Sequence, residues 1–242
     1  MKLRLLFFVV TLLVNTLSFS QEISGSELLE KAISFHDPNG NWLSLQAKLD
    51  ISMTTPDNQV RNSIVEIDLS QEYFQVTVFK DSITLKQTID KGQCQLSLNG
   101  NSNISEEEAS KHRLTCERAK MYKDYYTYLY GLPMKLKDQG TIIDSTIQKK
   151  RFKNKEYLVL KASYEKEIGE DTWYFYFDPT TFAMEVYQFF HDETKNDGEY
   201  ILLTDVEEID GIKIPKNRAW YYNKDDKYLG TDVLNNVGAL QK

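Results

Sequence analysis

The sequence predicts a mostly β fold (α+β by content), in which a curled antiparallel sheet of about 11–12 strands forms an incomplete β-barrel. Three observations support this. Polar and apolar residues alternate along many short segments. Short polar turns separate most of those segments. Aromatic residues make up 12% of the chain, with 15 Tyr and 12 Phe, and they suit pleated surfaces. A sheet with this many strands must close or curl to protect its edges.

The predicted strands fall into two runs, one on each side of a polar central region. In the first run, Leu45, Ala47 and Leu49 alternate with polar neighbours, which predicts a strand with one buried and one solvent-exposed face. The expected strands lie near residues 45–53, 61–69, 74–78, 83–89, 94–98, 142–151, 156–164, 172–177, 183–190, 200–209, 218–222 and 229–237.

The N-terminal segment is typical of a secretory signal peptide. It carries two positive charges, the apolar run Leu5–Val14 and the small-residue site Ser18-Phe19-Ser20. The run is too short for a membrane span of about twenty residues, although an uncleaved anchor is the alternative. We therefore expect residues 1–20 to be removed and residues 21–242 to form a single domain. No cysteine lies near the cut, so we expect no lipidation and a soluble periplasmic or secreted protein.

Capping signals predict an N-terminal helix. Ser24 and Glu27 have the spacing of a capping box, and the segment Asp37–Gly40 (DPNG) stops the helix. A second capping box, Ser105 with Glu108, opens a helical stretch that reaches about Tyr130 as two helices or one bent helix. We expect both helical parts to cover the concave face of the sheet.

The second helical stretch is followed by Gly131, which is placed as a C′ residue.

Charge limits the classes of partner. The whole chain has a net charge of −7, and loss of the predicted leader brings it to −9. This balance argues against nucleic acid and against anionic membrane surfaces. We expect no stable membrane insertion, a monomer, and a protein partner that the sequence does not identify.

Cys94 and Cys116 are the two cysteines of the chain. Cys94 shares a strand face with apolar residues, and Cys116 lies in the second helical stretch. In an oxidising compartment we expect a disulfide between them, with two buried free thiols as the alternative. The sequence has no CxxC motif, so a metal or catalytic role is not favoured.

Motifs for catalysis and for metal or cofactor binding are absent from the sequence. It contains no GxSxG, Walker, HxH or HExxH pattern. His36, His112 and His191 are expected at helix ends or on the surface. We therefore predict a protein that is not an enzyme and that uses no cofactor and no metal.

Aromatic strands in the second half of the chain are the main functional lead. Their inward faces would line a cavity for an apolar ligand, with two helical residues as a lid. The alternative is a plain core with an amphipathic outer face. The candidate cavity residues are Trp173, Phe175, Phe177, Met184, Val186 and Trp220, and the candidate lid residues are Tyr125 and Leu129.

The order of features in the second half resembles a known family. WYFYFDPTT is followed by FAMEVYQFF and then by TDVEEIDGIKIP, which reads as a strand, a tight Asp-Gly turn, a proline and then a further strand. This order resembles the periplasmic lipoprotein carriers of the LolA/LolB-like fold. The segment YLYGLPMKLKD looks like a family of secreted bacterial proteins of unassigned function with the same fold. The resemblance implies an unclosed barrel that curls around an apolar cavity, with helices over the open side.

Taken together, these features predict a non-enzymatic envelope protein that binds a lipid or the acyl chain of a lipoprotein. The alternative is an envelope protein-interaction module with a plugged barrel and no ligand. A secreted hydrolase is the remote third hypothesis, because no nucleophile–base motif supports it.

Overall fold

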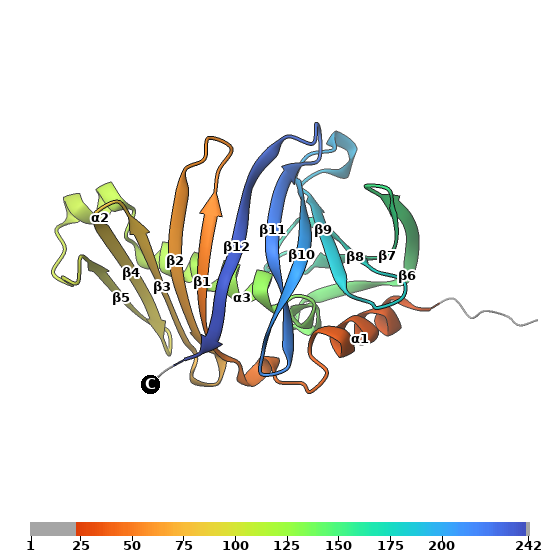
Figure 1. The fold of residues 1–242 in the computed structure, drawn as a ribbon, viewed down its shortest axis with the longest axis horizontal. Coiled ribbons are helices and arrows are strands. Elements are labelled where there is room, and N and C mark those ends of the chain that lie inside the picture. The colour runs from red at the N-terminus through yellow and green to blue at the C-terminus, as the bar shows by residue number, and fades with distance from the viewer. Residues whose placement is uncertain (1–22, 241–242) are drawn as a thin grey trace, which may run out of the picture.

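The computed structural model describes residues 23–240, and it confirms the predicted mostly β architecture (Figure 1). This part of the chain forms one antiparallel sheet of 12 strands in the order β5-β4-β3-β2-β1-β12-β11-β10-β9-β8-β7-β6. The sheet is not closed, because β5 and β6 are its two edges. The predicted signal peptide, residues 1–20, lies outside the described residues.

The strands are β1 (Gln46–Thr54), β2 (Val60–Asp68), β3 (Tyr73–Lys80), β4 (Ile83–Asp90), β5 (Gln93–Leu98), β6 (Thr141–Phe152), β7 (Lys155–Tyr164), β8 (Thr172–Phe177), β9 (Met184–Phe190), β10 (Glu199–Ile209), β11 (Ile212–Tyr222) and β12 (Tyr228–Ala239).

The first and last strands, β1 and β12, lie side by side in the middle of the sheet. From β1 the chain runs through successive hairpins to the edge strand β5, then crosses to the opposite edge at β6. It returns through hairpins to β12, which pairs with β1. The crossing segment contains α2 (Glu106–His112) and α3 (Cys116–Gly131), followed by the 3-10 helix η3 (Met134–Lys137). This path carries α3 across the concave face of the sheet (Figure 1).

Helix α1 (Gly25–His36) begins with the predicted capping box. The Ser24 hydroxyl accepts a hydrogen bond from the Glu27 backbone N–H at 3.2 Å, and the Glu27 carboxylate accepts one from the Ser24 N–H at 2.8 Å. These bonds satisfy backbone donors at the start of the helix. Its buried face, which includes Leu28 and Ala32, packs against β6, β7 and β11.

The second helical region is two helices, not one. Arg113 adopts a left-handed conformation with φ of 52° and ends α2, whose capping box at Ser105 is also present. Helix α2 has no buried residue, whereas α3 buries residues along its length against the sheet. Helix α3 therefore supplies the mid-chain cover of the concave face.

Gly131, the last residue of α3, does not adopt the left-handed conformation expected of a C′ glycine. Its backbone instead lies against the indole of Trp42, where an added Cβ would be 2.2 Å from Cζ2. Glycine is needed here for close approach and not for a positive φ.

The β10–β11 hairpin differs from the prediction, because β11 begins at Ile212 and not at Arg218. Asp210 and Gly211 make the tight turn with φ of 52° and 78°. Pro215 lies inside β11, in a part that pairs with β10 alone, since β12 joins β11 only from Asn217 onward. A strand that is hydrogen-bonded on one side tolerates proline.

Cys94 and Cys116 form the predicted disulfide, with an S–S distance of 2.07 Å and a Cα–Cα distance of 5.8 Å. The bond joins the first residue of α3 to the edge strand β5. It therefore fixes one end of the helix that covers the concave face.

Residues 23–240 include no helix that is both long enough and apolar enough to cross a membrane.

Candidate functional site

An aromatic layer lines the concave face of β8 and β9. Phe175 and Phe177 are fully buried, and Trp173 stacks on Phe175 with ring centroids 6.0 Å apart and planes 9° apart. Trp173 also stacks on Phe189 at 4.9 Å. Met184 belongs to the same buried cluster. The structure thus brings together four of the predicted cavity residues, but most of their surface is covered by neighbouring side chains.

Val186 does not belong to this layer. It packs on the outer face of the sheet with Tyr174 and Tyr176. The reason is a β-bulge: Tyr176 pairs with Val186, whereas the next residue, Phe177, pairs with Met184. The extra residue of β9 shifts the alternation, so the prediction that Val186 shares a face with Met184 is wrong. Tyr187 occupies the inward position instead.

Helix α3 covers the aromatic layer from inside the curl. Leu129, one predicted lid residue, is buried in the main core at 4% exposure. Tyr128 contacts Trp173 edge-on, with centroids 5.6 Å apart. Tyr125, the other predicted lid residue, is 37% exposed and stacks on Trp220 with centroids 6.4 Å apart and planes 18° apart. The Tyr125–Trp220 pair therefore marks where the concave interior reaches the surface.

A pocket of about 230 Å³ opens beside this pair, and we call it the mouth pocket. It combines aromatic rings with charged groups from β2, β10 and β12. Its lining residues are Met53, Arg61, Tyr125, Glu199, Trp220, Leu229, Gly230 and Asp232.

Charged residues form a row across the concave face beneath the mouth pocket. Met53 pairs with Arg61 on one side and with Asp232 on the other, and Asp232 pairs in turn with Arg218. Arg218 is 1% exposed, and its guanidinium lies 3.8 Å from the ring centroid of Tyr130 in α3. Burial raises the pKa of Asp232, while Arg218 and Arg61 act in the opposite direction.

This charged row was not among the sites predicted from the sequence. A signal for it exists, because Arg218 precedes Trp220, which packs against the core, by two positions, and Asp232 precedes the core residue Leu234 by two. Residues two apart in a strand share a face, so both charges occupy core positions.

A second hollow lies on the other side of α3. Its volume is about 550 Å³, and Tyr125, Tyr128 and Tyr164 are among its lining residues. The Tyr128 and Tyr164 hydroxyls share a hydrogen bond. This hydrogen bond joins α3 to β7, and apolar packing, the contact of Arg218 with Tyr130 and the disulfide also attach α3 to the sheet. Helix α3 is thus flanked by open space on both sides.

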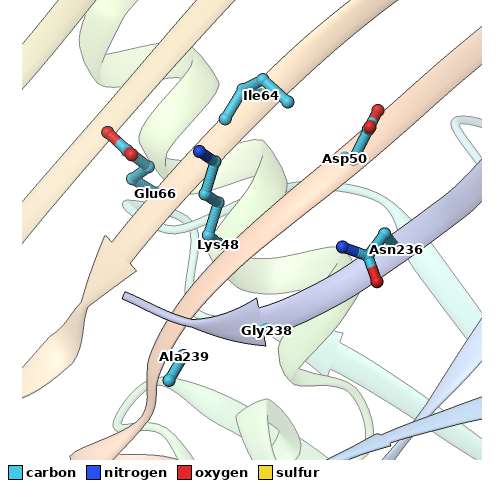
Figure 2. Close-up of a pocket in the computed structure, with 7 residues that line it drawn as sticks. All are labelled: Lys48, Asp50, Ile64, Glu66, Asn236, Gly238 and Ala239. Carbon is cyan, nitrogen blue, oxygen red and sulfur yellow. The ribbon is translucent and has the colours of Figure 1, made fainter. Parts of the chain in front are cut away.

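A further hollow of about 640 Å³ lies on the outer face of β1, β2 and β12, away from α3 (Figure 2). Lys48, Asp50 and Glu66 point outward there, and Gly238 leaves space because it has no side chain. The lining contains no aromatic residue. This surface lacks the features of an apolar-ligand site.

The histidines serve different roles. His36 is buried at the end of α1, where Nδ1 donates to the Lys213 carbonyl at 2.8 Å and Nε2 accepts from the Met184 N–H at 2.9 Å. His191 is exposed and pairs with Asp171 at 2.6 Å, which raises its pKa. Within residues 23–240, no group of three or more His, Cys, Asp or Glu side chains is placed to hold a metal ion.

The architecture is similar to the LolA fold, which confirms the predicted fold resemblance. A LolA superfamily protein from Nitrosomonas europaea aligns over 91% of this chain and 95% of its own, with a TM-score of 0.54 and 11% identity. A putative outer membrane lipoprotein-sorting protein domain from Vibrio parahaemolyticus aligns over 88% and 94%, with a TM-score of 0.51 and 8% identity. At these identities the likeness concerns the fold alone.

The chain belongs to a family of unknown function, DUF6503, whose model matches residues 2–236. No curated protein gives a significant match to this chain.

Proposed function

We propose that this protein is a non-enzymatic carrier of the cell envelope that binds a lipid or the acyl chain of a lipoprotein beneath α3. The observation that carries the proposal is the continuity between the buried aromatic layer and the surface. The layer on β8 and β9 reaches Trp220 through Tyr187, because the ring centroids of Tyr187 and Trp220 lie 6.2 Å apart. Trp220 in turn lines the mouth pocket. An apolar chain that enters there would pass the charged groups at the rim of the mouth pocket and then meet the aromatic and aliphatic side chains of the layer.

The mouth pocket alone is too small for such a ligand. Its volume of about 230 Å³ is below the roughly 300–1,000 Å³ of ordinary ligand sites. Entry therefore requires α3 to move away from the sheet. Its fixed end at Cys116 and the open space on both sides of Tyr125 favour a motion of its second half.

Two features support an envelope location. The disulfide is typical of oxidising compartments, and the two structural relatives include a lipoprotein-sorting domain. The predicted signal peptide agrees with this location.

A second candidate function is a protein-interaction module that carries no ligand. It is favoured by the close packing of Phe175, Phe177, Met184 and Leu129, none of which is more than 4% exposed. In this case α3 would be a permanent plug and the outer surfaces would bind the partner.

Binding of 1-N-phenylnaphthylamine, whose fluorescence rises in apolar surroundings, separates the two candidates. We expect saturable binding by the intact protein and at least about tenfold weaker binding after Trp220→Glu, because a buried charge at the mouth is costly. Tyr125→Glu on the surface of α3 should act in the same direction. Tyr222→Glu, at a 42% exposed position of β11, is the matched control.

Circular dichroism and thermal unfolding verify that each variant is folded. A folded wild-type protein that does not bind the probe would refute the carrier and leave the interaction module.

A further inference from the structure

The charged row beneath the mouth pocket contains buried hydrogen-bond donors without partners. The Arg218 side chain makes one hydrogen bond, from Nη1 to the Pro215 carbonyl at 2.8 Å. Within the described residues, its Nε and Nη2 atoms have no acceptor, although Arg218 is 1% exposed. A guanidinium can only donate, and a buried donor without an acceptor is destabilising.

Other donors gather at the same place. The Nε atom of Arg61, in the wall of the mouth pocket, is buried and has no partner in the described part of the chain. The hydroxyls of Tyr130 and Tyr187, which can donate or accept, lie beside Arg218 and are also buried without a well-oriented hydrogen bond in the described part of the chain. Burial raises the pKa of both tyrosines, so they stay protonated and able to donate at neutral pH.

Acceptors are scarce by comparison. Asp232 lies between Arg61 and Arg218 in the row, but no ion pair within 4.0 Å joins it to either residue in the described structure. Glu199, on the rim of the mouth pocket, likewise has a pKa raised by burial. The carboxyl groups present therefore leave the guanidinium N–H donors unmatched.

We propose that this cluster binds one anionic group, a carboxylate or a phosphate, at the end of the apolar ligand. The inference rests on the proposed carrier function and names the ligand class: a single-chain or multi-chain lipid with an anionic head. Arg61 would meet the head at the mouth pocket, and Arg218 would supply the deeper donors beneath Asp232. Charge-assisted hydrogen bonds of this kind are short and strong. The chain would extend over the aromatic layer.

The test compares ligands that share one chain and differ in the head. Dodecanoate, dodecyl phosphate and 1-dodecanol compete for bound 1-N-phenylnaphthylamine on the full-length mature protein. We expect the two anionic ligands to bind at least about tenfold more tightly than the alcohol, which is a difference in binding free energy of about 1.4 kcal/mol. Arg61→Gln and Arg218→Gln should reduce this preference to about twofold.

Arg151→Gln, on the exposed edge strand β6, is the matched control and should keep the preference. Arg61 is only partly buried, so its variant keeps the test valid if Arg218→Gln does not fold. Equal affinities for dodecanoate, dodecyl phosphate and 1-dodecanol would overturn the anion site and leave the carrier function intact. Inorganic phosphate that binds as tightly as dodecyl phosphate would overturn the lipid assignment. If none of the three dodecyl ligands binds, both proposals are overturned.

Discussion

At the scale of single residues, His36 connects three elements through one imidazole ring. Its hydrogen bonds to Lys213 and Met184 join the end of α1 to β11 and β9. Nε2 can accept the Met184 N–H only in the neutral ring, so protonation must break this contact. Burial is the main reason that the pKa of His36 is lowered from 6.5 to about 4.

This lowered pKa predicts an acid-sensitive fold. Between pH 6.5 and 4 the unfolded chain binds a proton at His36 that the folded chain does not, so stability falls as the pH falls. At about 1.4 kcal/mol for each difference of one in pKa, His36 accounts for about 3 kcal/mol lost between pH 7 and pH 4. Urea unfolding of wild type and His36→Gln at both pH values measures it. Identical pH dependence in the two proteins would disprove the assignment.

Gly131 gives a second prediction at the residue scale. An added Cβ would meet the Trp42 indole at 2.2 Å, so Gly131→Ala should lower the free energy of unfolding by about 1–3 kcal/mol. Gly238→Ala is the control, because its added Cβ would meet no atom of a non-adjacent residue within 4 Å. Gly238 lines the hollow on the outer face of β1, β2 and β12 (Figure 2). Chemical denaturation compares them, and equal losses would contradict the role of close approach.

At the scale of elements, the disulfide fixes the start of α3 to β5. Replacing Cys94 and Cys116 together by serine should cost about 3 kcal/mol, because the crosslink closes a loop with a sequence separation of 22. Unfolding of the double variant, compared with wild type in the presence and absence of reductant, tests this. Reduced wild type should match the variant, and an unchanged midpoint in both would refute a stabilising role.

Most elements were predictable from local patterns. Strict alternation located the strands of the first run, and two capping boxes located the starts of α1 and α2. The β-bulge in β9 was not predictable, because an unpaired residue shifts the alternation without a local signal; this misplaced Val186. The early start of β11 was hidden by Pro215, which is tolerated only because β12 pairs further along.

In the candidate site, the aromatic residues could be predicted from the sequence, but the assembly of the charged row could not. Alternation assigns a face to each residue, which sufficed for Trp173, Phe175 and Phe177 on β8. It does not tell which strands lie side by side. Arg61 and Asp232 are distant in sequence, and they become neighbours of Met53 only because β12 returns to pair with β1.

At the scale of the whole molecule, the path of the chain explains both the curled face of the sheet and the helix that covers it. The two runs of strands meet at the β1–β12 pair, and their outer ends remain free edges. The segment that connects those edges must cross the curled face, so α3 lies inside it (Figure 1). If α3 acts as the proposed lid, it can move without disturbing the hairpins that build the sheet, because no hairpin contains it.

The central claim is that the concave side accepts an apolar ligand beneath α3. The most direct measurement is organic extraction of the protein purified without detergent from envelope extracts, followed by mass spectrometry of the extract. The account predicts lipid in stoichiometric amounts from wild type and much less from Trp220→Glu purified in parallel. A folded wild-type protein that yields no lipid above the level of an unrelated envelope protein would contradict it.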